Sequence, residues 1–145
     1  MAASVFELIL ARVASVLLGG STAAGSNVFR ARDDAFADTE LPALNIRRAN
    51  TSGESEDVHD VELHQAAFTV AVHARGAAWE TAADALHMQA HALLLGDATL
   101  AGLGRPLRCT DTDSQSDSAD QPAGILTASY EMQVFVHAAS LSAAI

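Results

Sequence analysis

Two long segments with alternating apolar and polar residues constrain the fold of this chain more than any other feature. The first, residues 60–75, places apolar side chains on one face, namely Phe68, Val70, Val72 and Ala74. The second, residues 125–138, does the same with Leu126, Tyr130, Met132, Val134 and Val136. A period of two predicts strands, because successive side chains of a strand point to opposite faces of the sheet. We expect one face to lie on a core. The other, small and polar, would face solvent, a neighbouring subunit or a channel.

Two further segments have the spacing of amphipathic helices. Residues 3–18 form an apolar stripe made of Val5, Ile9, Val13 and Val16, and Gly19 and Gly20 follow as a stop signal. Residues 77–95 form the stronger helix, with a stripe made of Trp79, Ala83, Leu86, Ala90 and Leu93. Gly96 follows this second helix as its C-terminal signal. Two helices of this kind can cover one face of the sheet.

The segment 27–48 reads as a strand, a polar excursion and a second strand. Residues 28–31 alternate, an acidic run follows, and Pro42 favours an extended chain before the alternating residues 44–47. Residues 107–112 predict another short strand. The Ser-, Asp- and Glu-rich segments 50–59 and 113–124 are expected to be acidic loops, and 96–104 a short connection.

The order of these elements predicts an α+β fold for one domain of residues 1–145. Strands adjacent in the chain can pair as hairpins, so we expect a mixed, mainly antiparallel sheet with two helices packed on one face. A domain of this length buries about 68–70% of the surface of its unfolded chain, enough for a core without disulfides.

Charge and composition exclude several classes of protein. The net charge is −10, and all eight basic residues are arginine. Such a chain is a poor phosphate binder, although an acidic wall can repel DNA and keep it moving through a channel. The single cysteine, Cys109, excludes an internal disulfide and a thiolate cluster within one chain. No segment is apolar and long enough to cross a bilayer, so we expect no membrane contact.

The usual catalytic motifs fail when they are tested residue by residue. Gly20 and Gly25 have the spacing of a phosphate loop, but Ser26 stands where the lysine is required. An EF-hand beginning at Asp111 would need glycine and a carboxylate where Ser116 and Pro122 stand. No Gly-x-Ser-x-Gly segment occurs. We therefore predict no enzyme, no catalytic residues and no cofactor.

One helix flank offers a candidate metal site. Glu80, Asp84, His87 and His91 fall on one side of the helix predicted for residues 77–95. Such groups could hold a divalent ion between subunits, although a solvated helix flank is the simpler interpretation. A small metal-binding domain therefore stays open as an alternative function.

The segment 27–48 also carries a resemblance. Its pattern resembles the tail terminator proteins of long-tailed bacteriophages, the minor tail protein U family. The matching residues are Phe29, Arg30, Arg32, Asp34, Ala35, Glu40, Leu41, Pro42, Ala43 and Leu44. The resemblance implies an α+β fold and a homo-oligomer, a hexameric ring that caps the tail tube and stops its polymerisation. Its other face would meet the head–tail connector protein, and DNA would pass through the ring without specific binding.

The same resemblance implies a location in the virion and a set of binding partners. The protein would be assembled in the host cytoplasm and belong to the virion, at the head-proximal end of the tail, in contact with the tail tube protein. A neck or head–tail joining protein of similar size is the alternative within this class. We expect the subunit or partner interface to include Arg30, Arg32, Asp34, Glu40, Arg47 and Arg48. The acidic segments 50–59 and 113–124 are further candidates for contact with tube or connector.

Overall fold

The computed structural model describes residues 3–49, 52–58, 60–117 and 122–142. The strands are β1 (Val28–Arg30), β2 (Ala43–Arg48), β3 (Ser52–Val58), β4 (Val61–Arg75), β5 (Arg108–Asp117) and β6 (Ala123–His137). They form a six-stranded sheet in the order β1-β2-β4-β6-β5, with β3 also paired to β4. The β1–β2 pair is parallel and the other pairs are antiparallel. The predicted α+β fold with a mixed, mainly antiparallel sheet is confirmed.

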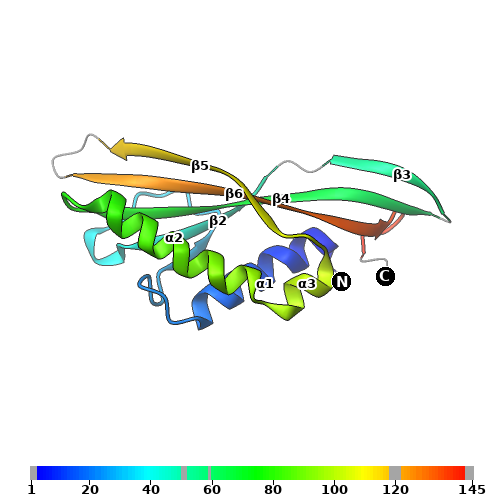
Figure 1. Cartoon of the computed structure of the whole chain (residues 1–145), viewed down its shortest axis with the longest axis horizontal. Coiled ribbons are helices and arrows are strands. Elements are labelled where there is room, and N and C mark those ends of the chain that lie inside the picture. Colours follow the sequence, from blue (N-terminus) through cyan, green and yellow to red (C-terminus); the bar gives the residue numbers. More distant parts are fainter. Residues whose placement is uncertain (1–2, 50–51, 59, 118–121, 143–145) are drawn as a thin grey trace.

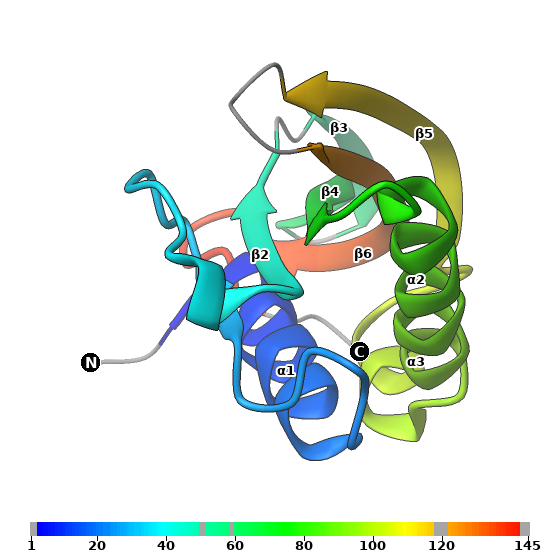
Figure 2. The same ribbon diagram turned by 90° about the vertical axis from the view of Figure 1, so that its left-hand side faces the viewer.

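Three helices cover one face of this sheet. They are α1 (Val5–Gly19), α2 (Trp79–Leu95) and the short α3 (Ala98–Leu103). All three lie below the sheet in Figure 1, and the turned view in Figure 2 shows α1 beneath β2 and β6 and α2 to the right of α1, under β5. The end of the sheet that contains β3 projects beyond the helices. No helix among the described residues is long and apolar enough to cross a membrane.

The core lies between the helices and one face of β2, β4 and β6. Phe68 of β4 pairs with Tyr130 of β6, and their rings lie nearly parallel, with centroids 5.3 Å apart. The residues that the alternating pattern predicts on the core face of β4 and β6 are buried except for Leu126, which is half-buried, and Ala66 and Ala128 are buried as well. From the helices, the core receives Val5, Ile9, Val13, Leu17, Ala83, Leu86, Ala90 and Leu94.

The connection predicted for residues 96–104 is instead a third helix, and this prediction was wrong. Asp97 is the N-cap of α3, because its carboxylate accepts a hydrogen bond from the backbone N–H of Leu100 at 3.0 Å. The same carboxylate accepts two hydrogen bonds from the Arg12 guanidinium of α1, at 2.7 and 2.9 Å. Leu100 anchors the helix in the core with 1% of its surface exposed. One carboxylate thus joins two helices.

Replacing Asp97 with alanine is expected to destabilise the protein by about 1 kcal/mol, the typical cost of losing an N-cap side chain. The variant Asp97→Asn keeps a capping oxygen and loses the charge paired with Arg12, so it should retain most of the stability. Urea unfolding of both variants measures the difference. An asparagine variant as unstable as the alanine variant would show that the cap is not the stabilising contact.

The two segments predicted as acidic loops are largely strands, which is a second correction. β3 pairs with the beginning of β4, and β5 runs on to Asp117 beside β6. Polar side chains do not prevent pairing here, because each segment lies along a strand that is already held by the core. Residues 50, 51, 59 and 118–121 of these predicted loops lie outside the described ranges.

Candidate interaction surface

The excursion between β1 and β2 is held by the side chain of Arg32. Its guanidinium lies over the rings of Phe29 and Phe36, 4.7 and 4.4 Å from their centroids. The same group donates two hydrogen bonds to Glu40, at 2.6 and 2.8 Å, and one to the carbonyl of Ala35 at 3.0 Å. An arginine can make these contacts together because its planar group stacks on rings while its edge donates hydrogen bonds. We call Phe29, Arg32, Phe36 and Glu40 the arginine clamp.

A buried asparagine fixes the backbone at the same point. Asn45 of β2 accepts a hydrogen bond from the N–H of Arg32 at 3.1 Å and donates one to its carbonyl at 2.9 Å. Asn45 is 2% exposed, so its side chain cannot bind water. The two hydrogen bonds to the Arg32 backbone satisfy its polar atoms instead. The excursion is therefore tied to β2 by backbone and side chain alike.

The clamp changes the acidity of its carboxylate. The hydrogen bonds from Arg32, and then that from the backbone N–H of Ala37, lower the pKa of Glu40 to about 2. The ion pair likewise raises the pKa of Arg32. Hydrogen bonds to the ionised form favour that form, so Glu40 stays charged well into the acid range.

Glu40 should therefore contribute to stability in a defined range of pH. The contribution is complete above the pKa of an unfolded glutamate, about 4.3, and is lost as the pH falls towards 2. We expect Glu40→Gln to melt below the wild type at neutral pH and together with it near pH 2. Melting curves at several pH values measure this. Asp34→Asn, which changes an exposed carboxylate of the same excursion, serves as the control and should show a smaller difference at neutral pH.

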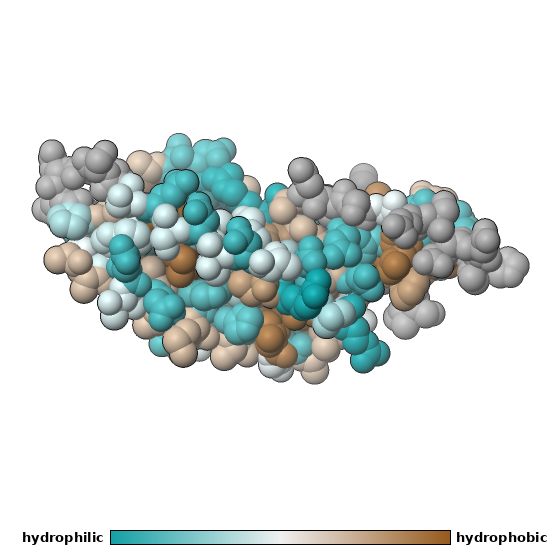
Figure 3. All heavy atoms as spheres, turned by 45° about the horizontal axis from the view of Figure 1, so that its top comes forward, coloured by the Kyte–Doolittle hydropathy of each residue, from teal (hydrophilic) through white to brown (hydrophobic). Residues whose placement is uncertain are grey.

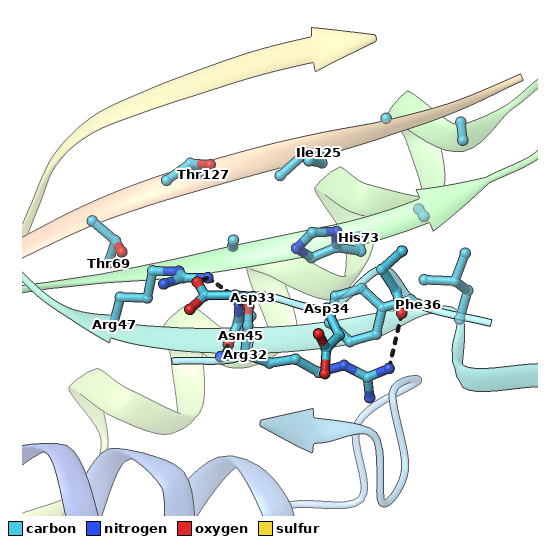
Figure 4. A pocket seen from close by; sticks show the side chains of 16 residues that line it. Arg32, Asp33, Asp34, Phe36, Asn45, Arg47, Thr69, His73, Ile125 and Thr127 are labelled. Atoms are coloured by element: carbon cyan, nitrogen blue, oxygen red, sulfur yellow. Dashed lines mark hydrogen bonds and ion pairs between the residues drawn. The ribbon is translucent and has the colours of Figure 1, made fainter. Parts of the chain in front are cut away.

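A hollow lies between the excursion and the open face of the sheet. Its volume is about 460 Å³, and Figure 4 shows the labelled side chains around it. Phe36 stands over His73 of β4, with ring centroids 4.5 Å apart. Burial, and then the charges of Arg47 and Arg32, lower the pKa of His73, which favours the neutral form of its ring. On the other side the lining comes from Ile125 and Thr127 of β6.

The charges around this hollow largely cancel. Arg47 of β2 forms an ion pair with Asp33 at 2.8 Å, and the Asp33 side chain is 85% exposed. Apolar walls from Leu41, Ala71 and Ile125 stand beside hydroxyl and imidazole groups. Such a mixed surface with balanced charges suits contact with another protein better than it suits a strongly charged ligand.

The structure does not gather the six predicted interface residues into one group. Arg32 and Glu40 belong to the clamp, and Arg32, Asp34 and Arg47 border the hollow. Arg30 and Arg48 turn towards α1 instead. Arg30 pairs with Glu7 at 2.7 Å, and Arg48 lies over the Phe6 ring at 4.8 Å. These contacts lie within one chain, and the interface role of the six residues stays a prediction.

Both sides of the molecule expose features suited to contacts. The helices expose Leu8, Leu18, Met88 and Leu95, of which Met88 is 64% exposed. On the open face of the sheet, Phe135 of β6 is 51% exposed opposite Leu63 of β4. Elsewhere this face carries polar side chains such as Thr69, Thr127 and Ser129 beside the apolar Ile125, and Figure 3 shows hydrophilic and hydrophobic residues intermixed on the visible side.

Two of the four residues considered as a metal site, His87 and His91, lie beside Tyr130 instead. His91 lies 3.0 Å from the hydroxyl of Tyr130 through its Nδ1, and His87 is half-buried beside the same ring. Burial, and then His91, lower the pKa of His87, while burial raises the pKa of Tyr130. Glu80 and Asp84 are exposed. Within the described ranges, no three acidic, histidine or cysteine side chains are placed to hold a metal ion.

Sequence reasoning missed the contacts that join distant segments. The Arg12–Asp97 pair spans 85 positions, and the His91–Tyr130 contact spans 39. For the Arg12–Asp97 pair, the sequence offers only the residue types as a signal. Arg12 lies on an amphipathic helix, and Asp97 lies just before a possible helix start. The arginine clamp could have been suspected from the local sequence, because Phe29 and Phe36 flank Arg32 within a polar segment.

Comparison with solved structures gives an informative likeness. The sequence matches no protein family model and no curated protein. Among solved structures, the fold is similar to a chain from the virion of a native gene transfer agent particle, with a TM-score of 0.50 and 15% sequence identity. The likeness covers 90% of this chain and 91% of that chain. At this identity it demonstrates a shared fold.

Proposed function

We propose that this chain is a structural protein of a phage-like virion, and specifically a tail terminator. It would form a hexameric ring on the head-proximal end of the tail tube, stop tube polymerisation and present its other face to the head–tail connector. The observation that carries this proposal is the fold shared, nearly end to end, with a chain of a gene transfer agent virion. The proposed role involves no catalysis and no cofactor.

The arginine clamp gives the sequence resemblance a physical reason. Phe29, Arg32 and Glu40 belong to the pattern that resembles tail terminators, and all three hold the excursion in place. A pattern of this kind specifies the shape of a surface rather than a reaction. It supports a role in which a rigid loop meets another protein.

The surface chemistry agrees with assembly around DNA. Single large apolar side chains are exposed on the helices and at Phe135, and such groups are available for subunit or partner contacts. The net charge of −10 disfavours binding of phosphates. A ring of such subunits would let DNA pass without holding it.

Ring closure requires two different surfaces of one subunit, because a head-to-tail interface repeats around the axis. We place Arg30 in such an interface, and the variant Arg30→Glu should weaken ring formation. That variant also breaks the internal pair with Glu7. The double variant Glu7→Arg/Arg30→Glu restores an internal pair of reversed polarity. Rings lost in both variants would support the interface role, whereas rings recovered in the double variant would restrict Arg30 to a role inside the subunit.

The mass of the purified protein tests the ring itself. Light scattering behind a sizing column should give a species near six times 15.0 kDa, and negative-stain images should show closed rings. A protein that stays at the mass of one chain at high concentration would contradict ring formation in solution. A closed ring of another size would correct the predicted number of subunits.

A further inference from the structure

The strand β5 forms one outer edge of the sheet and has an unused side. Within the part of the chain that the structure describes, it pairs with β6 alone. Among the described residues, no backbone hydrogen bond joins its ten residues to any other segment. The side chains of residues 110–116 are all exposed, so neither face of this part of the strand is covered. An unpaired edge of this kind is a template for an added strand.

The exposed side chains of this edge are acidic on one face. Asp111 lies opposite Ser129 and Asp113 opposite Thr127, which places both carboxylates on the open face of the sheet. They stand two residues apart, or about 7 Å along the strand. The structure shows no ion pair for either carboxylate among the described residues. Gln115 donates a weak hydrogen bond to Asp113 at 3.4 Å.

A second copy of the chain is a poor occupant for this edge. In the described ranges β3 pairs only with β4, and its sequence contains Glu54, Glu56 and Asp57, so β3 and β5 are both acidic strands. Like charges directly opposite each other destabilise a strand pair. In addition, five of the eight arginines already pair with carboxylates inside the chain. An arginine that already holds a carboxylate of its own chain has less charge to offer to an acidic edge of a neighbouring copy.

We propose that the outer edge of β5 binds an extended, basic segment of a different protein by strand addition. The backbone of β5 supplies hydrogen bonds, and Asp111 and Asp113 select lysine or arginine at alternate positions of the incoming strand. A bulge between Cys109 and Asp111 interrupts the register, so the docking segment begins at Asp111. The inference does not depend on ring formation, because one chain carries the whole site.

The test uses a labelled peptide of alternating threonine and lysine, with binding followed by fluorescence anisotropy. We expect saturable binding to the wild type. The variant Asp111→Asn/Asp113→Asn should bind about tenfold more weakly, since two exposed ion pairs are lost. Both substitutions are exposed, and far-UV circular dichroism checks that the fold is unchanged. A peptide of alternating threonine and glutamate should not bind.

A third peptide separates strand addition from simple charge attraction. It has the same sequence as the basic peptide, but alternate amides are methylated so that they cannot donate hydrogen bonds. We expect its binding to be lost. Equal binding of the methylated peptide, equal binding to the asparagine variant, or no binding of the basic peptide to the wild type would each overturn the proposal. Association of the wild type with itself through β5, detected as protection of β5 amides from hydrogen exchange at high concentration, would also overturn it.

Discussion

Replacing Tyr130 with alanine is expected to lower the free energy of unfolding by about 3–5 kcal/mol, the range for removing a buried aromatic ring. Tyr130 is 1% exposed and stacks on Phe68 in the middle of the sheet. Its ring also lies near those of His87 and His91 of α2, with centroids 6.4 and 5.8 Å away. The cavity left by alanine would therefore lie between sheet and helix, where neither layer can easily close it. Urea unfolding followed by circular dichroism measures the loss.

The variant Tyr130→Phe separates the ring from its hydroxyl. Phenylalanine keeps the stacking on Phe68 and loses the 3.0 Å contact between the hydroxyl and His91. Its cost should be about 1 kcal/mol, the net contribution of one hydrogen bond. If the alanine variant were no less stable than the phenylalanine variant, the ring would not be the central packing element that the structure indicates.

Replacing Gly124 with alanine is expected to destabilise the protein by about 1–3 kcal/mol through overpacking. A Cβ atom at this position would lie 2.4 Å from three ring atoms of Trp79. Trp79 begins α2 and is itself buried, so the indole cannot move aside without disturbing the contact of the helix with β6. Unfolding in urea and a blue- or red-shifted tryptophan emission would report the displaced ring.

Gly102→Ala is the matched control for this substitution. Gly102 lies in α3, is exposed, and a Cβ atom there would meet nothing within 4 Å. Alanine should be neutral or slightly stabilising at this position, because it has the higher helix propensity. Equal destabilisation by the two substitutions would mean that the close approach of Trp79 to Gly124 is not the cause.

The sequence predicts the elements that carry a strong period and lie on the core. β4 and β6 are found where Phe68, Val70 and Tyr130 alternate with polar residues, and α1 and α2 follow their apolar stripes. Burial follows the pattern in most of these positions, because the same side chains determine both. Val16 and Leu93 of the predicted stripes are only half-buried, and the neighbouring Leu17 and Leu94 are buried instead. The open polar face of the sheet follows from the same alternation.

The missed elements have weak local signals and depend on tertiary partners. β3 reads Ser-Gly-Glu-Ser-Glu-Asp-Val, a composition that disfavours strands, and it forms beside the start of β4. α3 has six residues, too few to be stable alone, and relies on Asp97 and on the buried Leu100. The secondary structure of these segments follows only once the element that each one packs against is known.

The candidate surface could be predicted only by residue type. An arginine- and aspartate-rich segment between two strands was visible, but the partner of each charge was not. Arg32 selects Glu40 because two phenylalanine rings hold its guanidinium over the excursion, and Arg30 selects Glu7 because β1 lies beside α1. Such choices depend on the packing of whole elements, which spacing along the chain does not encode.

Tube growth in the presence of this protein tests the central proposal most directly. Tubes would be assembled from the tail tube protein of the same particle, and their lengths measured by electron microscopy as the present protein is added. We expect elongation to stop as the protein saturates the tube ends, with ring-shaped density at one end of each tube. Tubes that grow equally long and remain uncapped at saturating concentration would contradict the proposed function.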